Sequence, residues 1–167
     1  RDLGSIMTHR SDLIWLNIQD SNETLRETVN AHLHTIYPVA DTKLDNIVGI
    51  VFLKDLFGRM DAPDFDLKAI VRPPQYFPQN QSVYNAMEHL KQGHTKYGLV
   101  TDEFGSIEGI VTLQDILKAL IGDLPELGEE PDIVQREDGT YLVDGQCPFY
   151  DFLAHFDMEC LYTNHYY

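Results

Sequence analysis

The sequence predicts an α+β fold built from two pseudo-symmetric repeats, each a helix-strand-strand-helix unit, followed by a partial C-terminal domain with a β-hairpin and a helix. Two observations predict this fold. Residues 49–56 (Gly-Ile-Val-Phe-Leu-Lys-Asp-Leu) recur as residues 109–116 (Gly-Ile-Val-Thr-Leu-Gln-Asp-Ile), and residues 34–39 recur at the same spacing as residues 94–99. A unit of about 60 residues that occurs twice predicts two similar halves related by an approximate twofold axis.

The first repeat is predicted to contain a helix, a β-hairpin and a short second helix. Polar side chains can cap the first helix, with Glu23 three residues after Asp20 as in a capping box. Its apolar face then carries a residue at every fourth position: Leu25, Val29 and Leu33. Two β-branched runs on either side of a polar turn predict the hairpin. We place the strands and the short helix at residues 36–40, 47–52 and 53–60.

The second repeat has the same order of elements with clearer signals. Asn80 can cap a helix that buries Val83, Met87 and Leu90, and Gly93 can end it in a left-handed conformation. Strands and a final helix are expected at residues 96–101, 106–112 and 113–122. A further match aligns residues 6–8 with residues 70–72, and prolines between the halves mark extended connections.

An acidic linker with two prolines, residues 123–131, separates the repeats from a tail at residues 132–167. We place the repeats themselves at residues 1–62 and 63–122. In the tail, strand signals surround Asp138-Gly139, a favoured hairpin turn, and a helix can begin at Pro148. This tail is too short to bury a core without help from other residues.

Charge and hydropathy limit the classes of partner. The chain has 27 acidic and 12 basic side chains, a net charge of −15 at pH 7, which would repel a polyanion and excludes nucleic acid as a partner. The longest apolar run, residues 47–53, is much shorter than the roughly 20 residues that cross a bilayer. Cys147 and Cys160 have neither zinc-ligand spacing nor a disulfide pattern, which favours a reducing cytosolic setting.

Metal binding and catalysis are not predicted. The seven histidines do not recur at the spacing that would bring them to one ion, and the acidic residues at 126–132 are typical of a solvated linker. The sequence has no phosphate-binding loop, no dinucleotide fingerprint and no nucleophile beside an evident base. We therefore expect that this chain is not an enzyme.

Thr112-x-x-Asp115 lies where a strand passes into a helix and allows two interpretations. A threonine at the N-cap with an acidic residue three positions later resembles a capping box. In the same geometry, a hydroxyl and free N–H groups at a helix start can receive a phosphate, and the carboxylate can accept hydrogen bonds from ribose hydroxyls. One residue pair can serve both purposes.

These residues carry a resemblance to a known family. The doubled block ending in Gly-Ile-Val-Phe-x-x-Asp and Gly-Ile-Val-Thr-x-x-Asp, with Tyr-Pro-Val at 37–39, resembles a tandem pair of CBS domains over residues 1–122. Residues 132–145 resemble the opening of the transporter-associated domain of CorC/HlyC proteins, the hemolysin-like and magnesium/cobalt-efflux group. The resemblance implies a module with two clefts between the repeats, where many such pairs bind an adenosine nucleotide.

The resemblance implies a nucleotide site in the first of these clefts, formed by Thr8, Ile36, Ile110, Thr112 and Asp115. Asp115 would hold the ribose, Thr112 and Thr8 the phosphate, and the two isoleucines would flank the adenine. The ligand would be AMP or ATP, with or without Mg²⁺. The choice stays open because Ile36 stands where many relatives have a basic side chain.

The second cleft departs from the family pattern, because Phe52 replaces the expected threonine. Asp55 keeps its ribose-binding position, and Arg72 and Lys96 stand at the positions equivalent to Thr8 and Ile36. These two cations could attract a phosphate or could be solvated surface charges.

The resemblance implies a cytosolic regulatory module of a CorC/HlyC-type protein, at the cytoplasmic face of the cell membrane. It implies a homodimer formed through the CBS modules and a membrane transport domain in the same full-length chain. The alternative is a ligand-free dimerisation scaffold in which Thr112 and Asp115 only cap a helix. A third interpretation, flavin adenine dinucleotide on the tail, depends only on distant fold relationships of that domain.

Overall fold

The computed structural model describes residues 1–122, 133–135 and 141–143. The chain divides into two compact units, residues 1–116 and residues 117–167. The helices are α1 (Asn22–Ala31), α2 (Leu53–Leu56), α3 (Val83–Gln92) and α4 (Leu113–Gly122), with 3-10 turns at Leu3–Ser5, Arg10–Asp12 and Leu67–Ala69. The strands of the first unit are β1 (Thr8–His9), β2 (Leu16–Asn17), β3 (Ile36–Ala40), β4 (Ile47–Phe52), β5 (Tyr76–Pro78), β6 (Tyr97–Thr101) and β7 (Ile107–Thr112).

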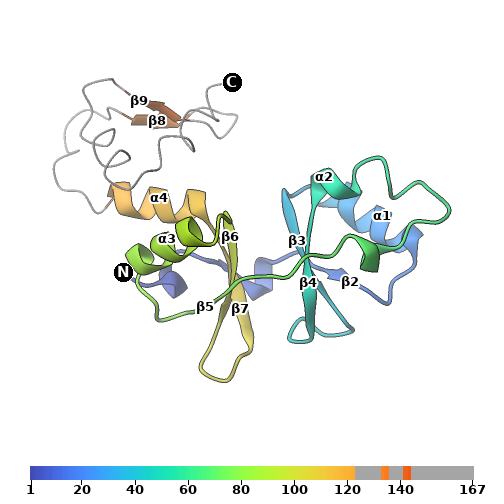
Figure 1. The fold of residues 1–167 in the computed structure, drawn as a ribbon, viewed down its shortest axis with the longest axis horizontal. Coiled ribbons are helices and arrows are strands. Elements are labelled where there is room, and N and C mark those ends of the chain that lie inside the picture. Colours follow the sequence, from blue (N-terminus) through green and yellow to red (C-terminus); the bar gives the residue numbers. More distant parts are fainter. Residues whose placement is uncertain (123–132, 136–140, 144–167) are drawn as a thin grey trace. The chain divides into compact units, whose positions relative to one another are not determined.

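The strands of the first unit form two sheets, one for each repeat (Figure 1). One sheet has the order β2-β3-β4 and the other the order β1-β7-β6-β5. Tyr37 pairs with Val51 in the first hairpin, and Gly98 pairs with Val111 in the second. Both hairpins also shift register at the same point, before Ala40 and before Thr101. The predicted α+β fold with two pseudo-symmetric repeats is therefore confirmed.

The two repeats exchange their first extended segments. β1 precedes the first repeat's helix but pairs antiparallel with β7 of the second repeat, through Thr8 and Ile110. Arg72 precedes the second repeat's helix and forms an antiparallel bridge with Ile50 in β4 of the first. Each sheet thus ends on a segment supplied by the other half of the sequence.

Apolar residues form separate clusters within and between the repeats. In the first repeat, Leu25 and Val29 of α1 pack with Leu56 of α2 and with buried residues of β3 and β4, so both helices cover one face of that sheet (Figure 1). A second cluster joins the repeats; its buried members are Ile36, Leu44, Ile50, Leu99, Ile107 and Ile110. The buried side chains at the junction are thus hydrophobic, which favours a fixed arrangement of the repeats.

The helix ends differ from those predicted. Ser21 caps α1 by accepting the N–H of Thr24, so the expected capping box of Asp20 with Glu23 is wrong. Because α1 ends at Ala31, Leu33 lies beyond the helix and is 69% exposed.

In the second repeat, Ser82 rather than Asn80 caps α3. Gly93 follows α3 with φ −81°, and the left-handed residue is His94 at φ 51°. The short helix α2 ends at Leu56, four residues before its predicted end.

In the second unit, β8 (Ile133–Gln135) and β9 (Tyr141–Val143) pair antiparallel, with Ile133 opposite Val143. This pairing is the one expected for a hairpin in the tail. The predicted turn at Asp138-Gly139 and the helix from Pro148 lie outside the described residues. Among the helices that the structure describes, none combines the length and the hydropathy that a membrane span requires.

Candidate functional site

The first candidate site is defined by Thr8, Ile36, Ile110, Thr112 and Asp115. Thr112 ends β7 and immediately precedes α4, so it occupies the N-cap of that helix. Asp115 Oδ2 accepts hydrogen bonds from Thr112 Oγ1 at 2.9 Å and from the Thr112 N–H at 3.1 Å. The Asp115 N–H in turn donates to Thr112 Oγ1 at 3.1 Å. The predicted capping box is therefore present.

The capping contacts leave part of this residue pair accessible. Asp115 accepts both bonds from Thr112 on Oδ2, and the Thr112 and Asp115 side chains are only half-buried. The Thr112 hydroxyl, however, donates to Asp115, and the Leu113 N–H donates to the carbonyl of Lys96 at 2.8 Å. Of the polar groups at the start of α4, the Asp115 carboxylate is thus better placed to meet a ligand than the Thr112 hydroxyl.

The remaining residues of this site are brought together from both repeats. Thr8 pairs with Ile110 on β7 and is exposed to solvent. Ile36 of β3 and Ile110 are both buried and belong to the cluster between the repeats. The structure thus places the exposed Thr8 hydroxyl beside an apolar wall formed by Ile36 and Ile110. Ile110 lies on β7, two residues before Thr112.

Residues that sequence analysis did not assign to a site lie close to this wall. Leu13 and Trp15 pack against the cluster that contains Ile36 and Ile110, whereas Ile14 packs against the core of the first repeat. This alternation of faces along residues 13–15, just before β2, is the signal that could have revealed them.

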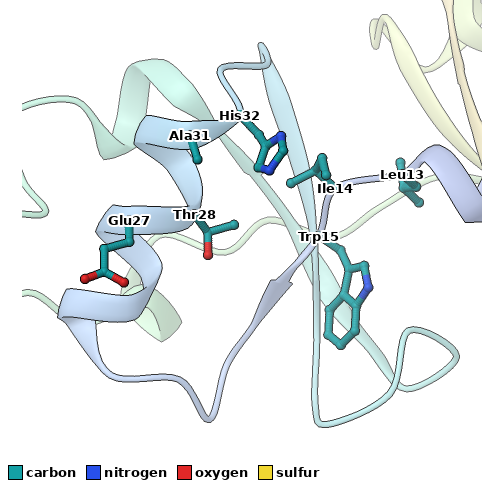
Figure 2. A pocket seen from close by; sticks show the side chains of 7 residues that line it. All are labelled: Leu13, Ile14, Trp15, Glu27, Thr28, Ala31 and His32. Carbon is teal, nitrogen blue, oxygen red and sulfur yellow. The ribbon is translucent and has the colours of Figure 1, made fainter.

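The same segment lines an open pocket of about 420 Å³ against the last two turns of α1 (Figure 2). The α1 side of the pocket is formed by Glu27, Thr28, Ala31 and the adjoining His32. In Figure 2, Trp15 and Glu27 point away from each other, so they do not converge on one point. None of the five residues of the first candidate site lines this pocket.

The second candidate site, with Asp55, Arg72 and Lys96, is occupied by its own side chains. Arg72 Nη2 lies 2.9 Å from Asp55 Oδ2, and its guanidinium carbon lies 5.1 Å from the centre of the Phe52 ring. The Phe52 ring also contacts Tyr97, with 5.7 Å between ring centres. Burial raises the pKa of the Tyr97 phenol, although a hydrogen bond with Thr35 opposes this effect.

The structure therefore brings Asp55 and Arg72 together, and it leaves Lys96 as an exposed side chain. Sequence analysis did not foresee the pair, in which Arg72 neutralises the carboxylate that the family pattern assigns to ribose. No group of three or more metal-ligating side chains occurs among the residues that the structure describes.

Comparisons with known proteins agree with this architecture. Residues 66–122 match the CBS domain family. A CBS domain protein from Shewanella oneidensis has a TM-score of 0.67 and 30% identity over 72% of this chain and 97% of its own. The CBS domain of a bacterial CNNM/CorC family Mg²⁺ transporter, solved in complex with ATP, has a TM-score of 0.66 and 27% identity over 74% of this chain and 89% of its own.

Curated relatives extend the match along almost the whole chain. The UPF0053 protein sll0260 of Synechocystis is 35% identical over 96% of this chain and 37% of its own length. The magnesium and cobalt efflux protein CorC of Pasteurella multocida is 31% identical over 91% and 52%. A polyamine export protein of Salmonella typhimurium is 30% identical over 95% and 36%. The chain thus spans between about a third and half of the length of these relatives.

The fold and these matches define a CBS-domain module. The chain belongs to the CBS domain family, and it is similar to part of the UPF0053 and CorC proteins. The relatives whose names state an activity are efflux or export proteins, which agrees with the expectation that the chain is not an enzyme.

Proposed function

We propose that this module binds an adenosine nucleotide, AMP or ATP, at the first candidate site and thereby regulates a membrane transport domain in the same full-length protein. The observation that carries the proposal is the position of Asp115. Asp115 is half-buried on the first turn of α4, and its carboxylate accepts both capping bonds from Thr112 on one oxygen. The other oxygen can accept a ribose hydroxyl while the helix cap stays intact.

The rest of the site fits the nucleoside better than a long phosphate chain. Ile36 and Ile110 offer buried apolar surface to the base, and Thr8 offers an exposed hydroxyl. Thr112 contributes to phosphate binding only if its hydroxyl exchanges Asp115 for the ligand. Support for the ligand class comes from the CNNM/CorC structure, which was solved in complex with ATP.

Regulation then follows from differential affinity. A nucleotide shifts the transport domain only as far as it binds one arrangement of the module better than another, which typically amounts to about 1–3 kcal/mol of coupling. The location at the cytoplasmic face, the homodimer and the assignment of residues 132–167 to a transporter-associated domain complete the proposal. Sedimentation of the chain with and without nucleotide tests the homodimer.

Titration calorimetry of this chain with AMP, ADP and ATP, with and without Mg²⁺, tests the binding. Asp115→Ala should abolish the saturable heat, and Asp55→Ala is the matched control because Asp55 holds the equivalent position at the second site. Quenching of Trp15, the single tryptophan of the chain, gives an independent signal because it packs against the cluster that contains Ile36 and Ile110.

The second candidate function is a ligand-free dimerisation scaffold, which the complete capping box favours. Absence of saturable heat at millimolar nucleotide would support it. Removal of the cap should lower the free energy of unfolding by about 1 kcal/mol with or without nucleotide. If Asp115→Ala also abolishes the extra unfolding free energy that nucleotide gives the wild type, the result instead supports ribose binding.

A further inference from the structure

Three hydrogen bonds among Arg10, Asp45 and Ile107 connect the hairpin of the first repeat with the sheet of the second. Asp45, in the β3–β4 turn, accepts the Ile107 N–H on Oδ1 at 3.0 Å. Arg10 Nη1 donates to the same carboxylate oxygen at 3.1 Å and to the Ile107 carbonyl at 2.8 Å. We name Arg10, Asp45 and Ile107 the inter-repeat clamp.

The clamp continues a strand pairing that the backbone leaves incomplete. β1 pairs with β7 only through Thr8 and His9, after which the chain turns into the 3-10 helix at Arg10–Asp12. Ile107 lies two residues beyond the last pair and is 1% exposed, so unpaired N–H and C=O groups there would be costly. The side chains of Asp45 and Arg10 supply the acceptor and the donor that a longer β1 would have supplied.

The clamp holds the segments that carry the first candidate site. Arg10 lies two residues after Thr8, and Ile107 lies three residues before Ile110 on the same strand. Asp45 belongs to the hairpin whose β3 strand begins at Ile36. Both walls of the site are thereby tied together at the hairpin end of the strands.

The second site lacks this device. At the spacing of the repeats, Gly105 stands at the position of Asp45 and Pro74 at the position of Arg10. Neither residue has a side chain that can form these bonds. The clamp therefore distinguishes the first site, where the helix cap engages one oxygen of Asp115, from the second, where Arg72 pairs with Asp55 and contacts Phe52.

We propose that Arg10 and Asp45 are positioning residues that set the spacing of the two repeats across the first site and hold it in its binding-competent arrangement. The inference rests on the proposed function. Both side chains are about two-fifths exposed, at 40% and 44%, so their charge attraction alone contributes little. The hydrogen bonds to Ile107 therefore account for most of the clamp's contribution. Loss of the clamp lowers the fraction of molecules in the binding-competent arrangement, and the apparent Kd for the nucleotide rises in inverse proportion to that fraction.

Calorimetric titration with AMP of the Asp45→Ala, Arg10→Met and double variants tests the clamp, at a temperature where all three are folded. Each single variant should raise the Kd by about fivefold or more, the lower end of typical coupling between sites. The double variant should fall short of the product, because both changes break one contact. Hydrogen exchange at the Ile107 amide should accelerate in Asp45→Ala, which removes its acceptor.

Asp102→Ala is the matched control, because Asp102 accepts the N–H groups of Phe104 and Ser106 within the second hairpin. It should leave the AMP Kd and the exchange of Ile107 unchanged. An unchanged Kd in Asp45→Ala, while the wild-type chain binds AMP, overturns the clamp inference alone. A wild-type chain without saturable AMP binding overturns the proposed function and with it this role of the clamp.

Discussion

The pKa of Asp45 depends on contacts that this carboxylate makes across the junction of the repeats. The hydrogen bond from the Ile107 N–H is the main cause that lowers the pKa of Asp45, and Arg10 adds a smaller effect in the same direction, while partial burial opposes both. A group with a lowered folded-state pKa stabilises the protein above its unfolded pKa, near 3.9 for Asp. That stabilisation is lost as the pH falls through the lower, folded value.

Unfolding measured between about pH 7 and pH 2 should show this loss. The difference in unfolding free energy between wild type and Asp45→Asn should be constant near neutrality and shrink below about pH 4, since only the wild type gains a proton there. The same shrinkage should persist, somewhat reduced, in an Arg10→Met background, because the Ile107 N–H is the larger cause. A difference that stays constant down to pH 2 would contradict this assignment.

At the scale of elements, the strands that sequence analysis predicted best are the buried ones. Residues 36–40 and 47–52 have their predicted bounds, because a β-branched run in a buried hairpin satisfies propensity and burial together. β1, β2 and β5 were not predicted, since strands of two or three residues show no period and exist only through pairing with distant partners. The capping box of α1 was misplaced by one residue and the N-cap of α3 by two, because several neighbouring polar residues could serve.

The contacts at the candidate sites also differ in whether the sequence alone could predict them. The Thr112 and Asp115 pair could be found because its contact is local, three residues along the chain. The ion pair of Arg72 with Asp55 and the clamp could not be found in this way, because their partners are distant in the sequence. Arg72 and Asp55 are 17 positions apart, Arg10 and Asp45 are 35 apart, and Asp45 and Ile107 are 62 apart. Such contacts depend on which repeat supplies the edge of which sheet, and a one-dimensional pattern does not contain that information.

The β3–β4 turn contains a strained residue. Thr42 has φ 68°, a left-handed conformation that costs a β-branched residue roughly 1–2 kcal/mol. Thr42→Gly should relieve this strain, although the greater freedom of glycine in the unfolded chain and the loss of the hydroxyl bond to Asp41 offset part of the gain. We expect the free energy of unfolding in urea to rise by about 0.5–1 kcal/mol.

Thr42→Ala is the control for this prediction, because it removes the same hydroxyl group and keeps a side chain at the left-handed position. It should be neutral or destabilising. Equal unfolding free energies for the alanine and glycine variants would show that the backbone conformation of Thr42 is not the source of the effect.

At the scale of the whole first unit, two equivalent glycines permit the exchange of segments between the repeats. A Cβ on Gly109 would lie 2.2 Å from the Thr8 carbonyl oxygen, and one on Gly49 would lie 2.5 Å from the Arg72 carbonyl oxygen. Both distances are shorter than atoms tolerate, so the repeated glycine is required where a foreign backbone crosses the strand.

Gly109→Ala should therefore lower the free energy of unfolding by about 1–3 kcal/mol, as expected for an overpacked contact with little room to relax. Gly4→Ala is the control, since its Cβ would meet nothing closer than 3.5 Å. Urea unfolding followed by Trp15 fluorescence measures both. The prediction is wrong if the two variants are destabilised equally.

Because β1 and Arg72 pair with the sheet of the other repeat, neither half of the duplicated sequence contains every segment of its own sheet. A cut in the peptide between the halves should yield two pieces that are each poorly structured and that recognise each other when mixed, each restoring the border strand that the other lacks. The two fragments would then show complementation, and a nucleotide bound between them would stabilise their complex.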